Sequence, residues 1–320
     1  MTPTAKAHWQ IHACVLLWGF TAILGKLITL PALPLVWWRM LLVAGALLLL
    51  PRIWRGLRAL PRRLRWAYAG VGALVALHWL TFYGAVKLAN ASVAATCMAL
   101  ATVFVALIEP RLSGRRISWR ELALGVAVLP GVALVVGGVP AEMRTGIAVG
   151  ALSALFVALF GSLNKRLVDR ADPLTVTAIE LGAGTVALTL LWPLVALLAP
   201  SLAGGFAAPG ARDAGYLLLL AFGCTLLPFA LSLAALRHMS AFSAQLAINL
   251  EPVYAIALAI LLLGEQRELT PAFYAGVAII MAAVLAHPLL ERRRAPPAQL
   301  HPENLATGEA RDLIEPRPND

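Results

Sequence analysis

Long apolar segments alternate with short polar ones along most of the chain. A helix of about 20 apolar residues crosses a hydrocarbon core of about 30 Å, so each long segment can span a membrane. The segments lack the strict polar–apolar alternation of barrel strands, which favours helices. We therefore predict an all-α integral membrane protein with ten transmembrane helices, at Trp9–Leu30, Leu33–Leu50, Trp66–Val86, Ala91–Ile108, Leu122–Gly138, Gly146–Leu163, Leu174–Leu198, Ala214–Leu236, Ala241–Leu263 and Pro271–Leu289.

The polar segments between these spans are too short for a soluble catalytic domain, because none exceeds about fifteen residues. Lys6 and the first span resemble the start of a signal peptide. The apolar core is long and no small-residue cleavage site follows it, so we expect it to remain as a helix. Residues 291–320 are polar and contain several prolines, which predicts a disordered cytoplasmic tail.

The composition supports a membrane protein and excludes an ordinary soluble enzyme. Of the 320 residues, 60% are hydrophobic and 13% charged. A soluble domain has about 45–50% apolar and about 25% charged residues, because its surface must be solvated. The net charge of +10 raises the alternative of a nucleic-acid-binding protein, which would need its basic residues on one exposed face.

The positions of the basic residues favour a role in membrane topology instead. With a cytoplasmic N-terminus, 20 of the 26 Lys and Arg residues lie in cytoplasmic loops and termini, and only Lys87, Arg144, Arg212 and Arg267 lie on the opposite side. Short cytoplasmic loops are enriched in Lys and Arg. We predict a multi-pass protein of the cell inner membrane with both termini in the cytoplasm. The arginines from 52 to 65 would then face anionic lipid, and no nucleic-acid partner is expected.

The two halves of the chain are weakly similar to each other. At an offset of 150 residues, Met98, Leu100, Val103 and Gly114 of the fourth span and its exit loop align with Ile248, Leu250, Val253 and Gly264 of the ninth. Five helices are an odd number, so two copies in one chain must insert in opposite orientations. This is the inverted-repeat plan of many secondary transporters, whose substrate site lies between the halves near the midplane.

The same segments resemble the EamA family of the drug/metabolite transporter superfamily. The motifs that look like this family's signatures are Trp18-Gly19 with Lys26, Pro34 with Arg39, Glu251-Pro252-Val253, and Leu263-Gly264-Glu265. The resemblance covers about residues 10–290 and is strongest over 247–286. It implies a ten-helix inner-membrane carrier, often an exporter of amino acids or other small metabolites. Residues 9–138 would form the first five-helix EamA-like repeat and residues 146–289 the second.

Two positions depart from the family pattern, both in the first repeat. Ala101-Thr102-Val103 stands where the family usually has a proline beside the valine. Arg115 stands where it usually has the glutamate found here as Glu265. Both departures put in doubt whether the fourth helix behaves as the family pattern suggests.

Ionisable side chains inside the spans are candidate functional residues, because burying one costs about 2.5–3.5 kcal/mol on insertion scales. Lys26 and Arg39 could line the substrate pathway and favour an anionic or carboxylate-bearing solute, or could extend outward to the membrane surface. Glu180 occupies the seventh span at the position that inversion relates to Arg39. Glu251 lies near the midplane, where it could bind substrate, couple transport to protons, or compensate the backbone beside Pro252.

Other polar and aromatic residues in the spans extend this candidate pathway. Gln245 and Asn249 share a helix face, whereas Glu251 points elsewhere unless Pro252 distorts the helix. His78 could line the pathway or only contact a neighbouring helix, and Trp18 and Tyr83 could line a pocket or only pack. The three cysteines, Cys14, Cys97 and Cys224, have no metal-binding or disulfide spacing, so we expect no metal or other cofactor.

These observations favour a secondary transporter, with a small-molecule solute and the lipid bilayer as partners. No GxxxxGK[ST] motif occurs, so ATP would not drive it unaided. Facilitated diffusion and proton exchange both remain open, with Glu251 as the better coupling candidate. Cationic drugs or other metabolites are alternative substrates.

An intramembrane lipid-modifying enzyme is disfavoured because Asp169 and Asp172 are the only close aspartates. A non-transporting membrane sensor is a further alternative. The GxxxG motif at Gly146 and Gly150 suits either internal packing or a homodimer.

Overall fold

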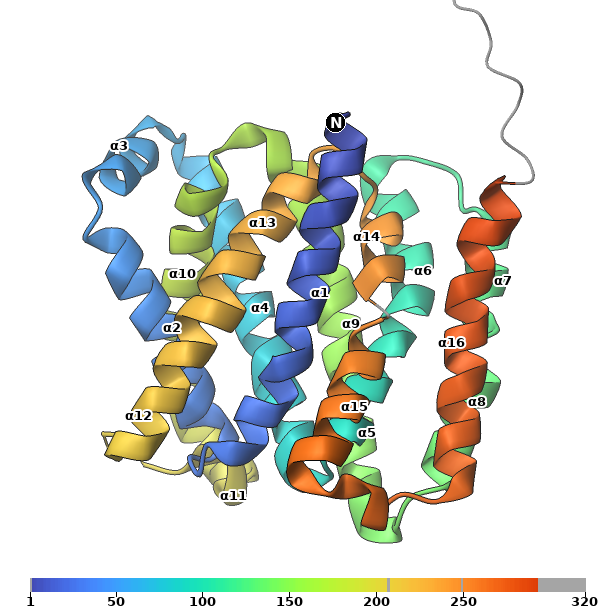
Figure 1. Ribbon diagram of the computed structural model, residues 1–320. Helices are drawn as coiled ribbons and strands as arrows, with labels where there is room; N and C mark the ends of the chain where they lie inside the picture. The colour runs from blue at the N-terminus through green and yellow to red at the C-terminus, as the bar shows by residue number, and fades with distance from the viewer. Residues whose placement is uncertain (1, 206–207, 249, 293–320) are drawn as a thin grey trace, which may run out of the picture. The chain divides into compact units, whose positions relative to one another are not determined.

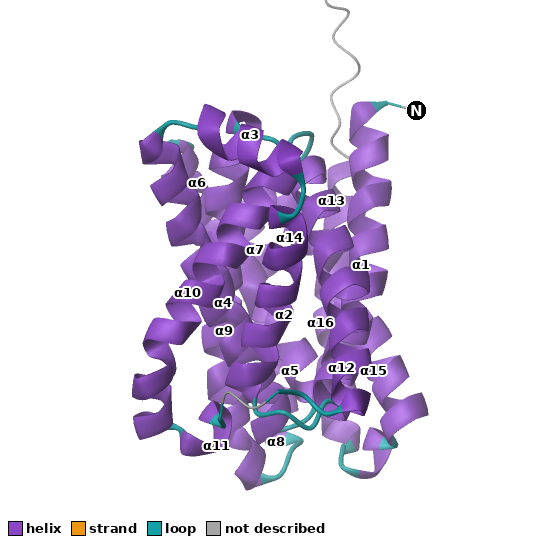
Figure 2. Cartoon of the chain, turned by 90° about the vertical axis from the view of Figure 1, so that its left-hand side faces the viewer, coloured by secondary structure: helices purple, strands orange, loops and turns teal. Residues whose placement is uncertain are grey.

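The computed structural model describes residues 2–205, 208–248 and 250–292, and these residues contain helices and loops but no strand (Figure 2). The chain divides into two compact units, Met1–Val284 and Leu285–Asp320. The described part of the second unit is the end of the last helix. The predicted tail lies outside the described residues from residue 293 onward.

The helices are shown in chain order in Figure 1. The first half contains α1 (Pro3–Leu27), α2 (Ala32–Leu48), α3 (Pro51–Ala59), α4 (Arg62–Leu88), α5 (Ala91–Cys97), α6 (Ala101–Ser113), α7 (Trp119–Val126) and α8 (Leu129–Gly137). The second half contains α9 (Arg144–Leu167), α10 (Pro173–Leu198), α11 (Pro200–Ala203), α12 (Ala211–Leu218), α13 (Leu227–Leu236), α14 (Ala241–Ile248), α15 (Glu251–Leu263) and α16 (Pro271–Arg292). Short 3-10 turns are η1 (Met98–Leu100), η2 (Ala141–Met143), η3 (Val168–Arg170) and η5 (Glu265–Arg267), and η4 (Leu219–Leu226) is π-helical.

Eight helical segments among the described residues are long and apolar enough to cross a membrane. The number becomes nine if α2 and α3, which meet at a bend of 91°, count as one span. α16 contributes a shorter apolar stretch, Pro271–Ala283, within the described side chains. The all-helical membrane class is therefore confirmed, whereas the number of ten spans remains a prediction.

The helix ends follow from local sequence. Asn90 accepts a hydrogen bond from Val93 N at the start of α5, and Asp172 accepts one from Thr175 N at the start of α10. Such side chains satisfy backbone donors that a helix leaves unpaired in its first turn. At the other end, Gly114 after α6 and Gly264 after α15 have φ of 69° and 70°. Glycine adopts this left-handed conformation without steric penalty, so both helices stop there.

The fourth and ninth predicted spans are each divided into two helices. α5 is followed by the 3-10 turn η1, and α6 begins at Ala101. α14 ends at Ile248 and α15 begins at Glu251. Glu251 is the position equivalent to Ala101 at the 150-residue offset, so the second helix of each span begins at the same place in the repeat. Pro252 lacks an amide hydrogen and so weakens the ninth span at its break. The fourth span has a 3-10 turn at the equivalent place although it lacks the proline.

The π-helical turn η4 and Pro228 loosen the backbone of the eighth predicted span. Pro228 cannot donate a hydrogen bond to the carbonyl of Cys224, four residues earlier. In the wider turn, the Thr225 hydroxyl donates to Leu220 O at 2.6 Å. Side chains of other helices can therefore bond to backbone groups of this segment, and the Cys14 thiol donates to Pro228 O at 3.1 Å.

Glycines allow α9 and α10 to pack closely against the first half. A Cβ at Gly146 would lie 2.7 Å from the Cβ of Ala89, and one at Gly150 would lie 2.9 Å from the side chain of Cys97. The GxxxG motif therefore serves packing within the chain. A Cβ at Gly72 of α4 would lie 2.2 Å from the carbonyl oxygen of Glu180, so the backbones of α4 and α10 are in direct contact at that point.

Candidate functional site

A cavity of about 110 Å³ lies among helices from both halves of the chain. Its lining comes from α1, α2, α4, α6, α9, α13, α14 and α15, together with Met98 of η1. Five of the nine predicted site residues contribute to it: Trp18, Arg39, His78, Gln245 and Glu251. The apolar walls include Phe82, Phe160 and Phe229. The cavity thus combines aromatic walls with a cation and a carboxyl group.

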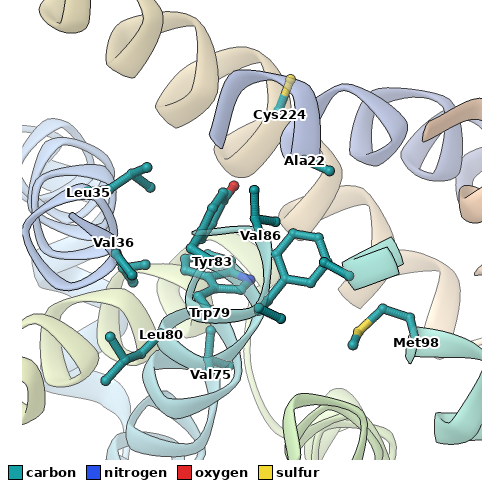
Figure 3. Packing of buried hydrophobic residues seen from close by; sticks show 14 of the residues in the cluster. Ala22, Leu35, Val36, Val75, Trp79, Leu80, Tyr83, Val86, Met98 and Cys224 are labelled. Atoms are coloured by element: carbon teal, nitrogen blue, oxygen red, sulfur yellow. The ribbon is translucent and has the colours of Figure 1, made fainter. Parts of the chain in front are cut away.

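Arg39 is 2% exposed and is held by side chains of α4 and by groups of η4. Its Nε donates to the Thr225 hydroxyl, its Nη1 donates to the Tyr83 hydroxyl at 2.9 Å, and its Nη2 donates to Cys224 O at 3.3 Å. The guanidinium carbon lies 3.8 Å from the ring centroid of Trp79. Figure 3 shows Trp79 and Tyr83 projecting from α4 toward the region between α2 and the segment that carries Cys224. The planar guanidinium thus stacks on an aromatic face while it bonds to the loosened backbone of η4.

The charge of Arg39 has no directly bonded carboxylate. The two ion pairs among the described residues, Arg52–Asp172 and Arg115–Glu109, do not involve it. Glu251 and Arg39 both line the cavity and interact electrostatically, but no nitrogen of Arg39 lies within 4.0 Å of a Glu251 oxygen. Opposite charges that face one cavity without closing into an ion pair can each bind a group of a solute.

His78 connects α4 to α9 at the cavity wall. Its Nδ1 lies 2.8 Å from the Ser153 hydroxyl and 3.1 Å from Ser153 O, while that hydroxyl also donates to His78 O at 2.8 Å. The ring centroid lies 5.4 Å from that of Phe160. His78 therefore both contacts a neighbouring helix and lines the cavity.

Gln245 of α14 and Glu251 of α15 line the same cavity. Gln245 is 4% and Glu251 7% exposed. Asn249, predicted to share the face of Gln245, lies outside the described residues.

The structure places the other predicted site residues away from the cavity lining. Tyr83 is fully buried behind it and reaches Arg39 through its hydroxyl. Lys26 is exposed in the last turn of α1 and does not share the environment of Arg39. Glu180 is fully buried on α10, where Oε2 accepts a hydrogen bond from Asn164 Nδ2 at 3.2 Å.

Two polar residues at the ends of predicted spans were not among the candidates. Asn164 lines the cavity, and Glu109 is a buried carboxylate of α6. The predicted spans end at Leu163 and Ile108, one residue before each, whereas α9 continues to Leu167 and α6 to Ser113. Both residues would have been found by extending the helical periodicity past the first polar position.

The chemistry of the described side chains gives no sign of a metal centre. Among the described residues no three His, Cys, Asp or Glu side chains lie close enough together to hold a metal ion. The three cysteines are unpaired and buried.

Comparisons with known proteins agree with this architecture. A protein of Streptantibioticus cattleyicolor named "Probable terminal-alkyne amino-acid exporter" is 29% identical over 233 residues, which cover 71% of this chain and 72% of that protein. A solved crystal structure superposes with a TM-score of 0.65 over 91% of this chain and 99% of its own, at 18% identity. This second likeness shows a shared fold alone.

The family assignment rests on a match to each half. The model of the EamA-like transporter family matches residues 6–137 and again residues 144–287. These stretches contain both broken spans and every residue named above as lining the cavity. The chain therefore belongs to the EamA-like transporter family and is a multi-pass membrane transporter.

Proposed function

We propose that the protein exports small amphipathic metabolites, amino acids first among them, across the cell inner membrane by alternating access. In this proposal ten spans form two inverted five-helix repeats, with both termini in the cytoplasm, and the repeats rock against each other around the cavity. The offset of 150 residues between the two broken spans supports such a repeat. The similarity to a named amino-acid exporter supports the substrate class.

The observation that carries the proposal is the separated pair of charges on one aromatic cavity. Arg39 would bind the carboxylate of an amino acid, and Glu251 its ammonium group, while the side chain packs on Phe82 and Phe160. The guanidinium of Arg39 is already held in position, because it bonds to Thr225 and Tyr83. Glu251 was a candidate both for substrate binding and for proton coupling, and its place at the cavity favours substrate binding.

The lining also supports cytoplasmic entry of the solute. Ile11, Asn164 and Leu236 belong to helix ends that lie toward the cytoplasm in the proposed topology, and all three line the cavity. A solute entering from that side would pass these residues before reaching Arg39. We propose export as the direction, in keeping with the similarity to a named exporter.

The test is binding and flux with purified protein in liposomes, over a panel of amino acids and cationic drugs. Glu251→Gln keeps the shape of the side chain and removes its charge, so amino-acid affinity should fall by about tenfold to a hundredfold. Glu142→Gln, at an exposed position, is the matched control and should behave as the wild type. Unchanged amino-acid affinity in Glu251→Gln, or transport of the drugs alone by the wild type, would contradict the proposal.

A further inference from the structure

Glu180 is a buried carboxyl group that the substrate cavity does not use. It is the only ionisable residue in the 26 residues of α10, and its exposed fraction is zero. It does not belong to the cavity lining, so a bound solute would not touch it. A lone carboxyl group in the membrane interior is costly and marks a functional site by default.

Two oxygen atoms at this position accept no hydrogen bond from any described residue. They are Oε1 of Glu180 and Oδ1 of Asn164, each on a side chain at least nine-tenths buried. Asn164 Nδ2 donates to the other carboxyl oxygen, Glu180 Oε2, at 3.2 Å. Buried polar atoms nearly always have partners, so two unpartnered acceptors on adjoining side chains indicate a missing positive group.

No described cation neutralises the carboxyl group from the helices packed on α10. The only basic residue of α2, Arg39, is bonded to Thr225, Tyr83 and Cys224, and Arg52 of α3 pairs with Asp172. Lys87 of α4 donates to Ile28 O. The other basic residues of α3 and α4 are exposed, namely Arg55, Arg58, Arg62, Arg63 and Arg65. α11 and α13 contain no ionisable residue. The charge of Glu180 is therefore left without a fixed counterion.

The remaining facing groups come from α4 and α9. Tyr68 of α4 interacts electrostatically with Glu180, but its hydroxyl donates to Leu167 O at 2.8 Å. Lys165, next to Asn164 on α9, donates to Leu236 O at 2.7 Å. With neither group bonded to the carboxyl, the simplest partner for Oε1 is a proton. Two oxygens are too few for a metal cation, which takes about six.

Resting on the proposed transport function, we propose that Glu180, held by Asn164, is the binding site for the proton that is exchanged for the exported solute. One proton from water adds to Oε1, which neutralises the buried carboxylate and turns an unpartnered acceptor into a donor. The same O–H bond breaks when the proton leaves on the other side. Solute and proton thus have separate sites, Glu251 with Arg39 for the solute and Glu180 for the proton.

The position of Glu180 lets its charge act on the contact between the two halves. Its backbone touches that of α4 at Gly72, and a Cβ at Gly184 would likewise lie 2.8 Å from Gly72 O. Asn164 lines the cavity and bonds to Glu180, so a single side chain separates the carboxyl group from the cavity. Charging or neutralising this group therefore bears on the interface that must move during alternating access.

The test measures two activities separately in proteoliposomes: exchange of amino acid across the membrane, and accumulation of amino acid driven by a pH gradient. With equal pH on both sides, Glu180→Gln should exchange labelled for unlabelled amino acid as the wild type does. With a pH gradient, the wild type should accumulate the amino acid and Glu180→Gln should lose that accumulation. Accumulation that persists in Glu180→Gln overturns the proton site, whereas absence of any exchange by the wild type overturns the proposed function instead.

A second variant and a direct proton measurement guard against a folding defect. Glu180→Asp retains a titratable group at a changed distance from Asn164, so the pH midpoint of gradient-driven accumulation should shift. An unshifted midpoint would overturn the proposal.

In weakly buffered detergent solution with a pH-indicator dye, amino-acid binding should release protons from the wild type and from Glu142→Gln but not from Glu180→Gln. Equal release from all three would also overturn it.

Discussion

The two broken spans, α5–α6 and α14–α15, each begin at a helix N-terminus that is held by a carboxylate from the opposite half of the chain. Glu265, just after α15, accepts hydrogen bonds from Ala91 N and Ser92 N, each at 3.0 Å, at the start of α5. Glu109 of α6 accepts them from Ala241 N at 3.1 Å and Phe242 N at 2.8 Å, at the start of α14. Figure 1 shows α15 beside α5 and α14 beside α6.

The difference between the two ends lies in how the carboxylate is supplied. At the 150-residue offset the counterpart of Glu265 is Arg115, so the first half has no carboxylate at that position. Glu109, six residues earlier, takes over the two backbone bonds, and Arg115 pairs with it at 3.2 Å. Glu265 has no described cation within 4.0 Å and accepts instead from the Ser92 hydroxyl at 2.7 Å.

This comparison shows that the electrostatic requirement belongs to the helix end rather than to a sequence position. The amide groups of a first turn carry partial positive charge, and in a membrane they have no water to bond with. A carboxylate from either of two positions can satisfy them. The departure at Arg115 therefore changes which residue supplies the accepting carboxylate, and the cap itself stays in place.

The largest effect should come from Glu265→Ala. The change leaves two backbone amides and the Ser92 hydroxyl without their acceptor in a buried site, which should cost roughly 3 kcal/mol of unfolding free energy. Denaturant titration of the purified protein in detergent micelles measures it. Glu142→Ala, at an exposed position, is the control and should change stability by less than about 0.5 kcal/mol. A loss for Glu265→Ala as small as the control's would show that the α5 end does not depend on its carboxylate.

Glu109→Ala should have a smaller effect, about 2 kcal/mol, because it removes two backbone bonds and no hydroxyl contact. Its partner Arg115 has a side chain that is 51% exposed and can turn to water. The decisive variant is the double change Glu109→Ala with Arg115→Glu, which puts a carboxylate at the position equivalent to Glu265. Stability measured in the same titration should recover in part. No recovery would mean that the two ends are not equivalent.

The smallest effect should come from the two C-terminal glycines, and it should be the same at both ends. Gly114→Ala and Gly264→Ala each place a Cβ on a backbone with φ near 70°, with no atom within 4 Å to clash. The strain of a left-handed residue is about 1 kcal/mol, so each variant should lose about that much in the denaturant titration. Clearly unequal losses of stability in the two variants would show that the two helix ends are not equivalent. A gain in stability would rule out backbone strain at these positions.

Much of the architecture could be predicted from local sequence. The long apolar segments predict membrane helices because a bilayer interior admits few other structures. The 150-residue similarity between Gly114 and Gly264 also marks two helix ends with the same backbone conformation. Span limits were less accurate, because a polar residue such as Asn164 or Glu109 ends an apolar run without ending the helix.

The candidate site also has a part that the sequence predicted and a part that it did not. Sequence singled out Arg39, His78, Glu180 and Glu251, because ionisable groups at membrane depth are costly and few. It could not place them relative to one another. Only the packing of α14 and α15 against the other helices places Gln245 and Glu251 at one cavity, and the turn η4 supplies the groups of Cys224 and Thr225 to which Arg39 bonds.

The sequence by itself therefore determined the membrane class, the family and a short set of costly buried groups, because hydropathy and burial cost depend on each residue and its near neighbours. Only the tertiary structure decided which of those groups meet. Arg39 and Glu251 face one cavity while Glu180 lies behind its wall, and Glu109 substitutes for a carboxylate missing at residue 115. The pairs Arg39 with Glu251 and Glu109 with Ala241 are each more than a hundred positions apart, and their distances are set by helix packing that a local pattern does not encode.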